Sequence, residues 1–269
     1  MRRSLGGLIL LISAGLFALA VGAFWMERVA FTPEPTTDTA FAILGDEEIR
    51  LQVASIIAGA DAEALGVSAN ELRQQISDVA QIRAGATEMR RFTAAAHARI
   101  IGENDDTVEI TAAEQVQIVR TERAAVLPPV TLPVERVTSL AVVGSLASWV
   151  WLVSFAVGAV ALLLGLALRP ERGEASFAFA CGCAGTGASV LLFGYLIPGF
   201  VLDSTSDAVW TGALPRLAAM NRTTTLVAAL VLVAIGGAVS FLTSGNRQRR
   251  QRSTPLAATR FREPQRWTG

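Results

Sequence analysis

The chain has 269 residues, of which 52% are hydrophobic, and its 23 acidic residues balance 23 basic ones to a net charge of zero. That apolar fraction exceeds the usual balance of soluble proteins, so the composition excludes an ordinary soluble globular protein and predicts membrane spans. The zero net charge averages two unlike parts, because residues 27–137 are rich in acids whereas the segment after Gly245 holds seven arginines and one glutamate.

Four apolar stretches are long enough to cross a membrane. Each reaches the roughly 20 residues that a helix needs to span about 30 Å of hydrocarbon, and none contains a charged residue. The stretches are Leu5–Trp25, Thr138–Leu168, Ser176–Leu202 and Thr223–Ser244. We therefore predict an all-α integral membrane protein with four transmembrane helices, three of them grouped in residues 138–244.

Arginines near the ends of the spans predict how the chain is oriented. Arg2 and Arg3 precede the first span, and Arg169 and Arg172 lie in the short connection between the second and third. Because cytoplasmic flanks are enriched in arginine, we expect both termini to be cytoplasmic and residues 27–137 to be extracytoplasmic. The protein is thus predicted to be a multi-pass protein of the cell membrane.

The first 26 residues favour an uncleaved signal anchor. An Ala-x-Ala sequence at Ala18–Ala20 is also compatible with a cleaved signal peptide. The apolar run continues past that point to Trp25, which suits an anchor at the outer membrane interface. The second span is longer than one bilayer, so we expect Trp149 and Trp151 to be interfacial anchors too, with the preceding residues extending the helix outward; a long tilted helix with buried tryptophans is the alternative.

Residues 27–137 predict one small domain of about four short amphipathic helices. Asp46 is a candidate N-cap, and two capping boxes are expected at Ser68-x-x-Glu71 and Thr111-x-x-Glu114. "TVEI", residues 107–110, favours an extended segment. The core is expected to be modest, because many of its apolar positions are alanine or valine, so the domain is expected to rest on the membrane part or on a partner.

The arrangement resembles a group of uncharacterised multi-pass membrane proteins of actinobacteria. The most similar stretches are "LGDEEIRLQVASII" and "RRFTAAAHARIIG", together with the proline connector "LPPVTLP". The resemblance implies an N-terminal span, a helical extracytoplasmic domain, three further spans and a location in the cell envelope. It carries no catalytic residue.

Both cysteines lie in "FAFACGCAGTGAS", residues 177–189. A Cys-x-Cys pair can bind soft metals or undergo redox chemistry, but two thiolates do not complete a four-ligand zinc site. Lipidation is a third alternative. The small residues nearby favour close helix packing instead, because they let helices approach in lipid. The predicted helix-packing stripe is Ala178, Gly182, Thr186 and Ser189.

Three further features carry weaker predictions. His97 is expected to be a surface or domain-contact histidine, because no nucleophile motif accompanies it. The acidic "GENDDTVE", residues 102–109, does not have EF-hand spacing and is expected to be a solvated turn. The tail 245–269 is expected to be disordered and to contact anionic lipid headgroups; the arginines nearest the membrane are Arg247, Arg249, Arg250 and Arg252.

No catalytic, cofactor-binding or metal-binding motif emerges, and no nucleic-acid-binding module accompanies the arginines. We therefore expect a non-enzymatic membrane protein of the bacterial envelope, a scaffold or accessory subunit that binds a membrane-protein partner or forms a homo-oligomer. A small oligomeric transporter or channel is one alternative, although its spans lack ionisable residues. An envelope sensor that binds a ligand through the extracytoplasmic domain is the other.

Overall fold

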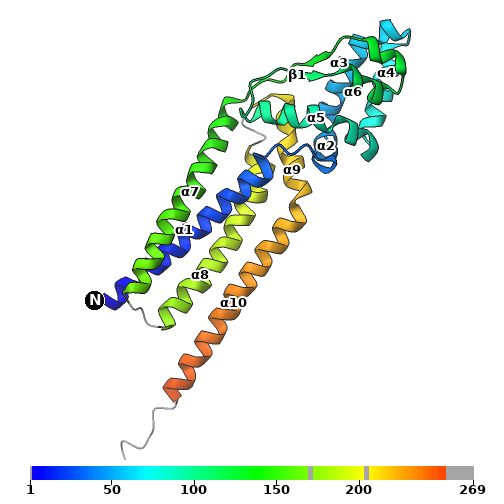
Figure 1. Ribbon diagram of the computed structural model, residues 1–269. Helices are drawn as coiled ribbons and strands as arrows, with labels where there is room; N and C mark the ends of the chain where they lie inside the picture. Colours follow the sequence, from blue (N-terminus) through cyan, green and yellow to red (C-terminus); the bar gives the residue numbers. More distant parts are fainter. Residues whose placement is uncertain (1, 169–171, 203–205, 253–269) are drawn as a thin grey trace, which may run out of the picture.

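The structure is a computed structural model that describes residues 2–168, 172–202 and 206–252, with side chains for residues 5–168, 173–202 and 206–243. It has two parts (Figure 1). Long helices run side by side along most of its length, and a smaller domain of short helices covers one end. We call this smaller part, residues 31–137 and 206–221, the head domain.

Four helices are long and apolar enough to cross a membrane, which confirms the predicted number. They are α1 (Arg2–Ala30), α7 (Thr138–Ala167), α8 (Arg172–Leu191) with its continuation η2 (Leu192–Val201), and α10 (Arg222–Arg252). Two of these helices are longer than the predicted spans. Helix α1 continues through residues 27–30, and α10 continues eight residues beyond Ser244. The start of α1 and the end of α10 lie at the end opposite the head domain (Figure 1).

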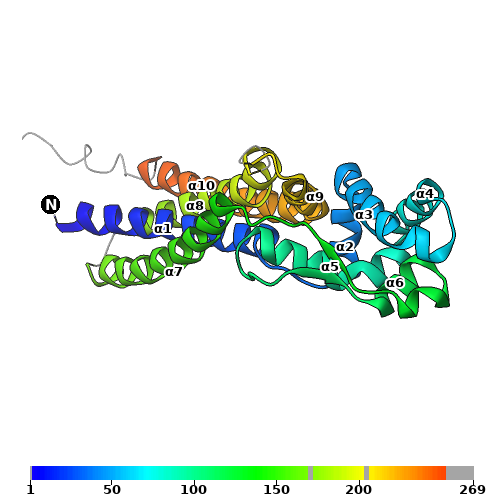
Figure 2. The same cartoon turned by 90° about the horizontal axis from the view of Figure 1, so that it is seen from above.

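The four long helices form a row rather than a closed bundle. Helix α1 packs between α7 and α8, and α10 packs on the other side of α8. The view along the row shows α7 and α10 at its opposite edges (Figure 2). Each edge helix therefore has one long helix as its neighbour, whereas α1 and α8 each have two.

Polar and aromatic contacts join α1 to α7. The hydroxyl of Ser13 donates to the carbonyl oxygen of Gly158 over 2.8 Å, and Gly158 also lies close to Leu16. The rings of Phe17 and Phe155 meet edge to face, with centroids 5.6 Å apart. A glycine at the contact permits the approach that the hydrogen bond requires, because any larger residue at 158 would meet Leu16.

The third span ends in a π-helical segment, η2, which contains Pro198. Proline has no amide hydrogen and its ring clashes with the carbonyl of the residue four positions earlier, so regular α-helical bonding fails here. The wider π turn continues the helix in its place. The third span therefore changes helix type near Pro198 and is not interrupted there.

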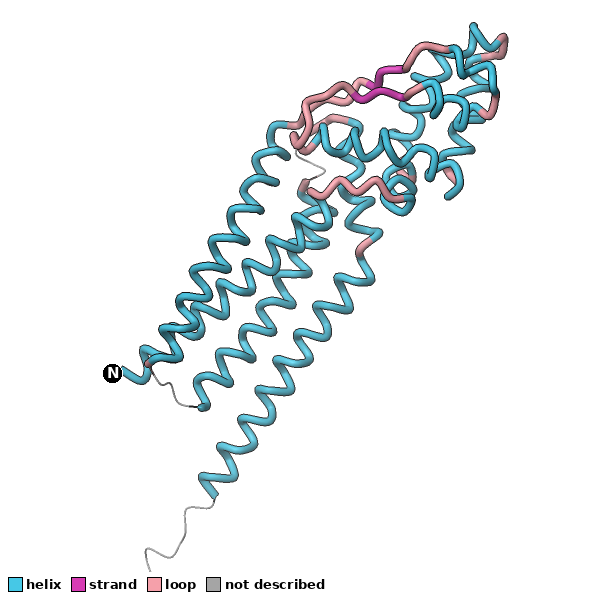
Figure 3. Tube along the Cα trace, viewed as in Figure 1, coloured by secondary structure: helices cyan, strands magenta, loops and turns pink. Residues whose placement is uncertain are grey.

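The head domain contains five α-helices before the second span. Short helices joined by loops make up most of it (Figure 3). A two-stranded antiparallel sheet pairs Val108 with Leu132 and Ile110 with Val130. The extended segment predicted at "TVEI" is confirmed as the first strand. The elements are α2 (Thr37–Leu44), α3 (Glu47–Leu65), α4 (Ala69–Ala80), α5 (Arg83–Ile100), β1 (Val108–Ile110), α6 (Ala112–Val119), the 3₁₀ helix η1 (Glu122–Val126) and β2 (Val130–Leu132).

All three predicted helix starts are confirmed, and two of them have the expected side-chain caps. The Asp46 carboxylate accepts from the amides of Glu48 and Ile49, and Thr111 and Glu114 form a reciprocal capping box. The capping box predicted at Ser68 is wrong: Ser68 does occupy the N-cap position of α4, but its side chain makes no capping bond. Helix α4 is stabilised instead by its apolar face, which buries Leu72 and Ile76.

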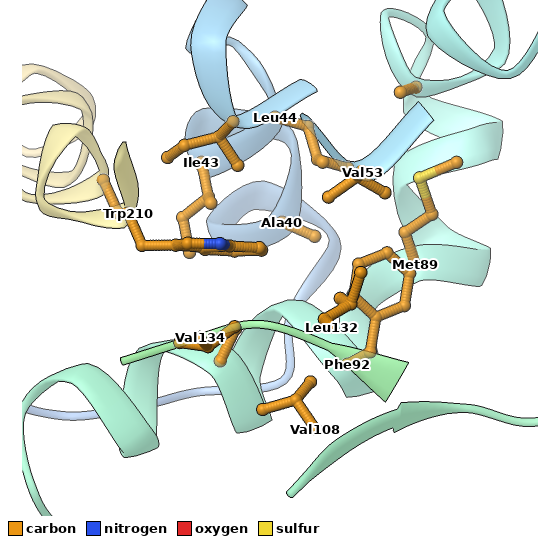
Figure 4. Close-up of a cluster of buried hydrophobic side chains, with 14 of the residues drawn as sticks. Ala40, Ile43, Leu44, Val53, Met89, Phe92, Val108, Leu132, Val134 and Trp210 are labelled. Carbon is orange, nitrogen blue, oxygen red and sulfur yellow. The ribbon is translucent and has the colours of Figure 1, made fainter. Parts of the chain in front are cut away.

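The connection between the third and fourth spans belongs to the head domain. It forms the 3₁₀ helix η4 (Val209–Gly212) and helix α9 (Ala213–Met220), which pack against α2, α3 and α5. Trp210, 3% exposed, lies among Ala40, Ile43 and Val134 in the core (Figure 4). The sequence prediction grouped this segment with the three membrane helices of residues 138–244 and did not assign it to the domain.

Replacing Trp210 by alanine tests whether this connection stabilises the head domain. We expect Trp210→Ala to destabilise it by about 3–5 kcal/mol, because a large buried ring leaves a cavity. Trp149→Ala is the matched control, since Trp149 on α7 is 66% exposed. Thermal unfolding of the purified protein, followed by circular dichroism, should show a lower midpoint for the first variant only. Equal midpoints would contradict the assignment.

Candidate functional site

The predicted small-residue stripe on α8 faces α1. A Cβ added at Gly182 would lie 3.1 Å from Cβ of Ala14, and one added at Gly22 would lie 2.8 Å from Cβ of Ser189. Ala178 on the same stripe is buried. These contacts lie within the protein, so the stripe joins two of its own spans.

Thr186, the fourth residue of the stripe, uses its hydroxyl within its own helix. Its Oγ1 donates to the carbonyl oxygen of Gly182 over 2.8 Å. Bonding of this kind is a common way for serine and threonine to satisfy a hydroxyl inside a membrane helix. Thr186 therefore presents mostly its methyl group to neighbouring residues.

A second small-residue contact joins the opposite side of α8 to α10. A Cβ added at Gly187 would lie 2.8 Å from the carbonyl oxygen of Ala229, and one added at Gly236 would lie 2.7 Å from that of Ala180. Helix α8 thus has small residues on two faces, one for each neighbour. This second face was not identified from the sequence, although Gly187 and the pair Gly236–Gly237 would have indicated it.

Both cysteines are reduced and partly buried. Cβ of Cys183 would lie 3.3 Å from a Cβ added at Gly236, which places this thiol beside the contact between α8 and α10. Within the described residues, no group of three or more His, Cys, Asp or Glu side chains could hold a metal ion. The environment of Cys183 is that of a small apolar residue in a helix contact.

An apolar groove of about 380 Å³ opens on one face of the row. All four long helices line it: Ala14 from α1, Leu162 and Leu166 from α7, Gly182 from α8 and Leu232 from α10. Because both edge helices contribute, this face of the row is concave. The hydroxyls of Ser13 and Thr186 also lie here but donate to backbone carbonyls, so the groove is apolar in character.

The three predicted interfacial tryptophans lie in different surroundings. Trp25 donates its indole N–H to Oγ1 of Thr225 over 3.0 Å and packs so closely on Gly194 that a Cβ there would lie 2.2 Å from its ring. It thereby joins α1, η2 and α10. Trp151 meets Phe24 edge to face, with centroids 5.8 Å apart, whereas Trp149 is exposed.

The predicted lipid-contacting arginines lie at the far end of α10. The helix extends to Arg252, but the side chains of Arg247, Arg249, Arg250 and Arg252 lie outside the described residues. Their contact with anionic headgroups stays a prediction. The rest of the tail, residues 253–269, also lies outside the described residues.

The acidic turn after α5 is held by arginines. Asp105 pairs with Arg136 over 3.0 Å, and Arg99 donates to the backbone carbonyls of Asp105 and Asp106. Asn104 also accepts from the amide of Asp106 through its side chain. These contacts connect the turn to the segment that leads into α7.

Two ionisable side chains are buried in the head domain, each 1% exposed. His97 on α5 lies 2.9 Å from the carbonyl oxygen of Ala30, and burial lowers its pKa. Of the two predictions for His97, the domain contact is therefore confirmed and the surface position is wrong. Asp61 on α3 has one carboxylate oxygen with no hydrogen-bond partner, and burial raises its pKa. Sequence analysis did not single out Asp61.

Comparison with known proteins adds no relative to this picture. No protein-family model, no curated protein and no solved structure matches the chain.

A matched pair of neighbouring glycines tests the contact between α8 and α10. We expect Gly236→Leu to lower the thermal midpoint and the yield of monodisperse protein, because its side chain would clash with the backbone at Ala180. Gly237→Leu should be tolerated, since nothing lies within 4 Å of a Cβ there. Size-exclusion chromatography and thermal unfolding in detergent give the comparison. Similar losses in both variants would exclude this packing.

Proposed function

We propose that this protein is a non-enzymatic membrane protein of the bacterial cell envelope, a scaffold or accessory subunit of a larger membrane assembly. The observation that carries the proposal is the open row of long helices. The most apolar 18-residue windows of α7 and α10 are only 17% buried, against 33% for α1. The edges and the concave face thus remain available to another membrane protein.

The partner we propose is an apolar transmembrane helix that packs along the concave groove. Helices in lipid associate through close van der Waals contact, for which small residues are needed. Ala14 and Gly182 provide such residues at the floor of the groove, and larger side chains such as Leu166 and Leu232 flank them. A second copy of this chain and a lipid acyl chain are the other occupants that the experiment must distinguish.

The attachment of the head domain supports a scaffolding role. The domain is connected to the membrane part through the end of α1, the start of α7 and the α9–α10 connection. The chain also passes from the third span into η4, so four covalent connections join the domain to the membrane helices and restrict its movement more than one linker would. We infer that it presents its surface at a defined place beside the membrane, as a subunit that positions a partner would require.

We propose that the head domain is extracytoplasmic and that both termini are cytoplasmic. The arginines at residues 2, 3, 169 and 172 and in the tail support this orientation. The resemblance to actinobacterial multi-pass proteins supports an envelope location. Contact between the tail and anionic headgroups belongs to the same proposal.

Thiol labelling tests the orientation. Cys181 and Cys183 are first replaced by alanine, which the packing of Cys183 should tolerate, and single cysteines are then placed at Ser68 or Ser253. In intact cells, a membrane-impermeant maleimide should label Ser68→Cys and should reach Ser253→Cys only after lysis. Labelling of the tail position alone in intact cells would overturn the proposed orientation.

Co-purification tests the partner. The tagged protein, extracted from its host in mild detergent, should retain a stoichiometric membrane protein identified by quantitative mass spectrometry. Leu166→Trp should reduce recovery of that partner at least tenfold, because the indole would fill the groove. Leu163→Trp is the control, since Leu163 is 68% exposed and does not line the groove.

Other outcomes of the same experiment exclude the proposed partner. Recovery of the protein only with copies of itself would replace the partner by a homo-oligomer. Recovery with lipid alone, unchanged by Leu166→Trp, would remove the basis for an accessory subunit.

A further inference from the structure

The end of α5 and the turn after it contact the start of α7 at two places. The carbonyl oxygen of Ile100 accepts from the amide of Val137, the residue before α7, over 3.1 Å. Gly102, with φ of 74°, lies so close to α7 that a Cβ there would approach Cβ of Ala141 to 2.6 Å. Glycine is required by both the backbone angle and this contact. We call the contacts of residues 97–102 with α1 and α7 the joint.

His97 is the buried titratable group in the joint. Its Nε2 lies 2.9 Å from the carbonyl oxygen of Ala30, the last residue of α1. Because a carbonyl oxygen can only accept, Nε2 carries the proton and His97 is the neutral Nε2–H tautomer. Its other nitrogen, Nδ1, is buried and has no hydrogen-bond partner.

The charged groups on the elements around the joint are engaged elsewhere or add nothing to the lowered pKa of His97. Burial lowers the pKa of His97, and the hydrogen bond to the Ala30 carbonyl partly offsets that effect. On the surrounding elements, Ser148 donates to Oε1 of Glu27, Arg28 pairs with Glu34, Asp38 pairs with Arg83, Arg99 donates to the carbonyl oxygen of Val134, and Arg136 pairs with Asp105. Glu135 and Asp207 form no ion pair with any residue that the structure describes.

We propose that the joint is an acid-sensitive contact, in which protonation of His97 releases the end of α5 from α1 and lets the head domain move relative to the membrane helices. A proton added to Nδ1 would create an imidazolium in a buried site where no protein group accepts its new N–H. Unpaired buried charges are strongly disfavoured, so the ring would leave the site to reach water.

The direction of the pH dependence follows from linkage. Histidine exposed to water has a pKa of about 6.5. The joined state binds the proton less readily than the released state, because burial lowers the pKa of His97. The contact is therefore fully favourable above about pH 6.5 and weakens progressively as the pH falls below it.

Distance measurement between two spin labels tests the proposal. In the cysteine-free protein, labels are placed at Ser68→Cys at the start of α4 and at Leu146→Cys on the exposed side of α7. Pulsed electron spin resonance in lipid nanodiscs should give one narrow distance distribution at about pH 7.5. It should give a shifted or broader one at about pH 5, with a midpoint below about 6.5.

Two variants show which residue causes the pH response. His97→Gln should keep the high-pH distribution at both pH values, because its amide can donate to Ala30 but cannot be protonated in this range. Asp61→Asn, which removes the other buried ionisable group of the head domain, should respond as the parent protein does.

The proposal is overturned if the parent distribution does not change between these pH values, if its midpoint lies above about 6.5, or if His97→Gln responds like the parent. Loss of the response in Asp61→Asn would overturn it in favour of Asp61. If His97→Gln does not fold, the titration of the parent protein decides on its own whether the contact responds to acid below about pH 6.5.

Discussion

Close approach between small residues is the interaction on which the membrane part depends. Lipid provides no hydrophobic force to bring apolar helices together, so their contacts rely on backbone proximity and short hydrogen bonds. Helix α8 meets both of its neighbours in this way, with Gly182 against Ala14 and Gly187 against Ala229. Without α8, α10 would lose its main contact with the row. The open shape of the row follows from this pairing, because the small-residue contacts join each helix to the next and do not close the row on itself.

The head domain also depends on the membrane helices, which hold part of its core in place. Its core includes Trp210 from the connection between the third and fourth spans, and α5 rests on the end of α1 and the start of α7. The place of α9 and η4 in the core is therefore set from both sides, by the core itself and by the spans that this connection joins. A modest core rich in alanine and valine becomes adequate once this additional segment and the membrane helices cover it.

Sequence reasoning succeeded where local chemistry decides the structure. The four spans follow from length and hydropathy, and the caps at Asp46 and Thr111 follow from residues within three positions of each other. It failed where partners are distant in the chain. Trp25 donates to Thr225, 200 residues away, and nothing near Trp25 predicts that. Trp210 is likewise buried by residues more than 70 positions away, such as Ala40, Ile43 and Val134. The burial of His97 has the same cause, since Ala30 lies 67 residues before it.

The two buried ionisable groups of the head domain respond to acid in opposite directions. Burial raises the pKa of Asp61, so protonation of Asp61 favours the folded domain as the pH falls. Burial lowers the pKa of His97, so protonation there opposes the contact with α1. Because Asp61 lies on α3 and His97 lies at the joint, acid strengthens the interior of the domain while it weakens the attachment. Their combination favours movement of an intact head domain over its unfolding, which is the behaviour that a reversible response at a membrane surface requires.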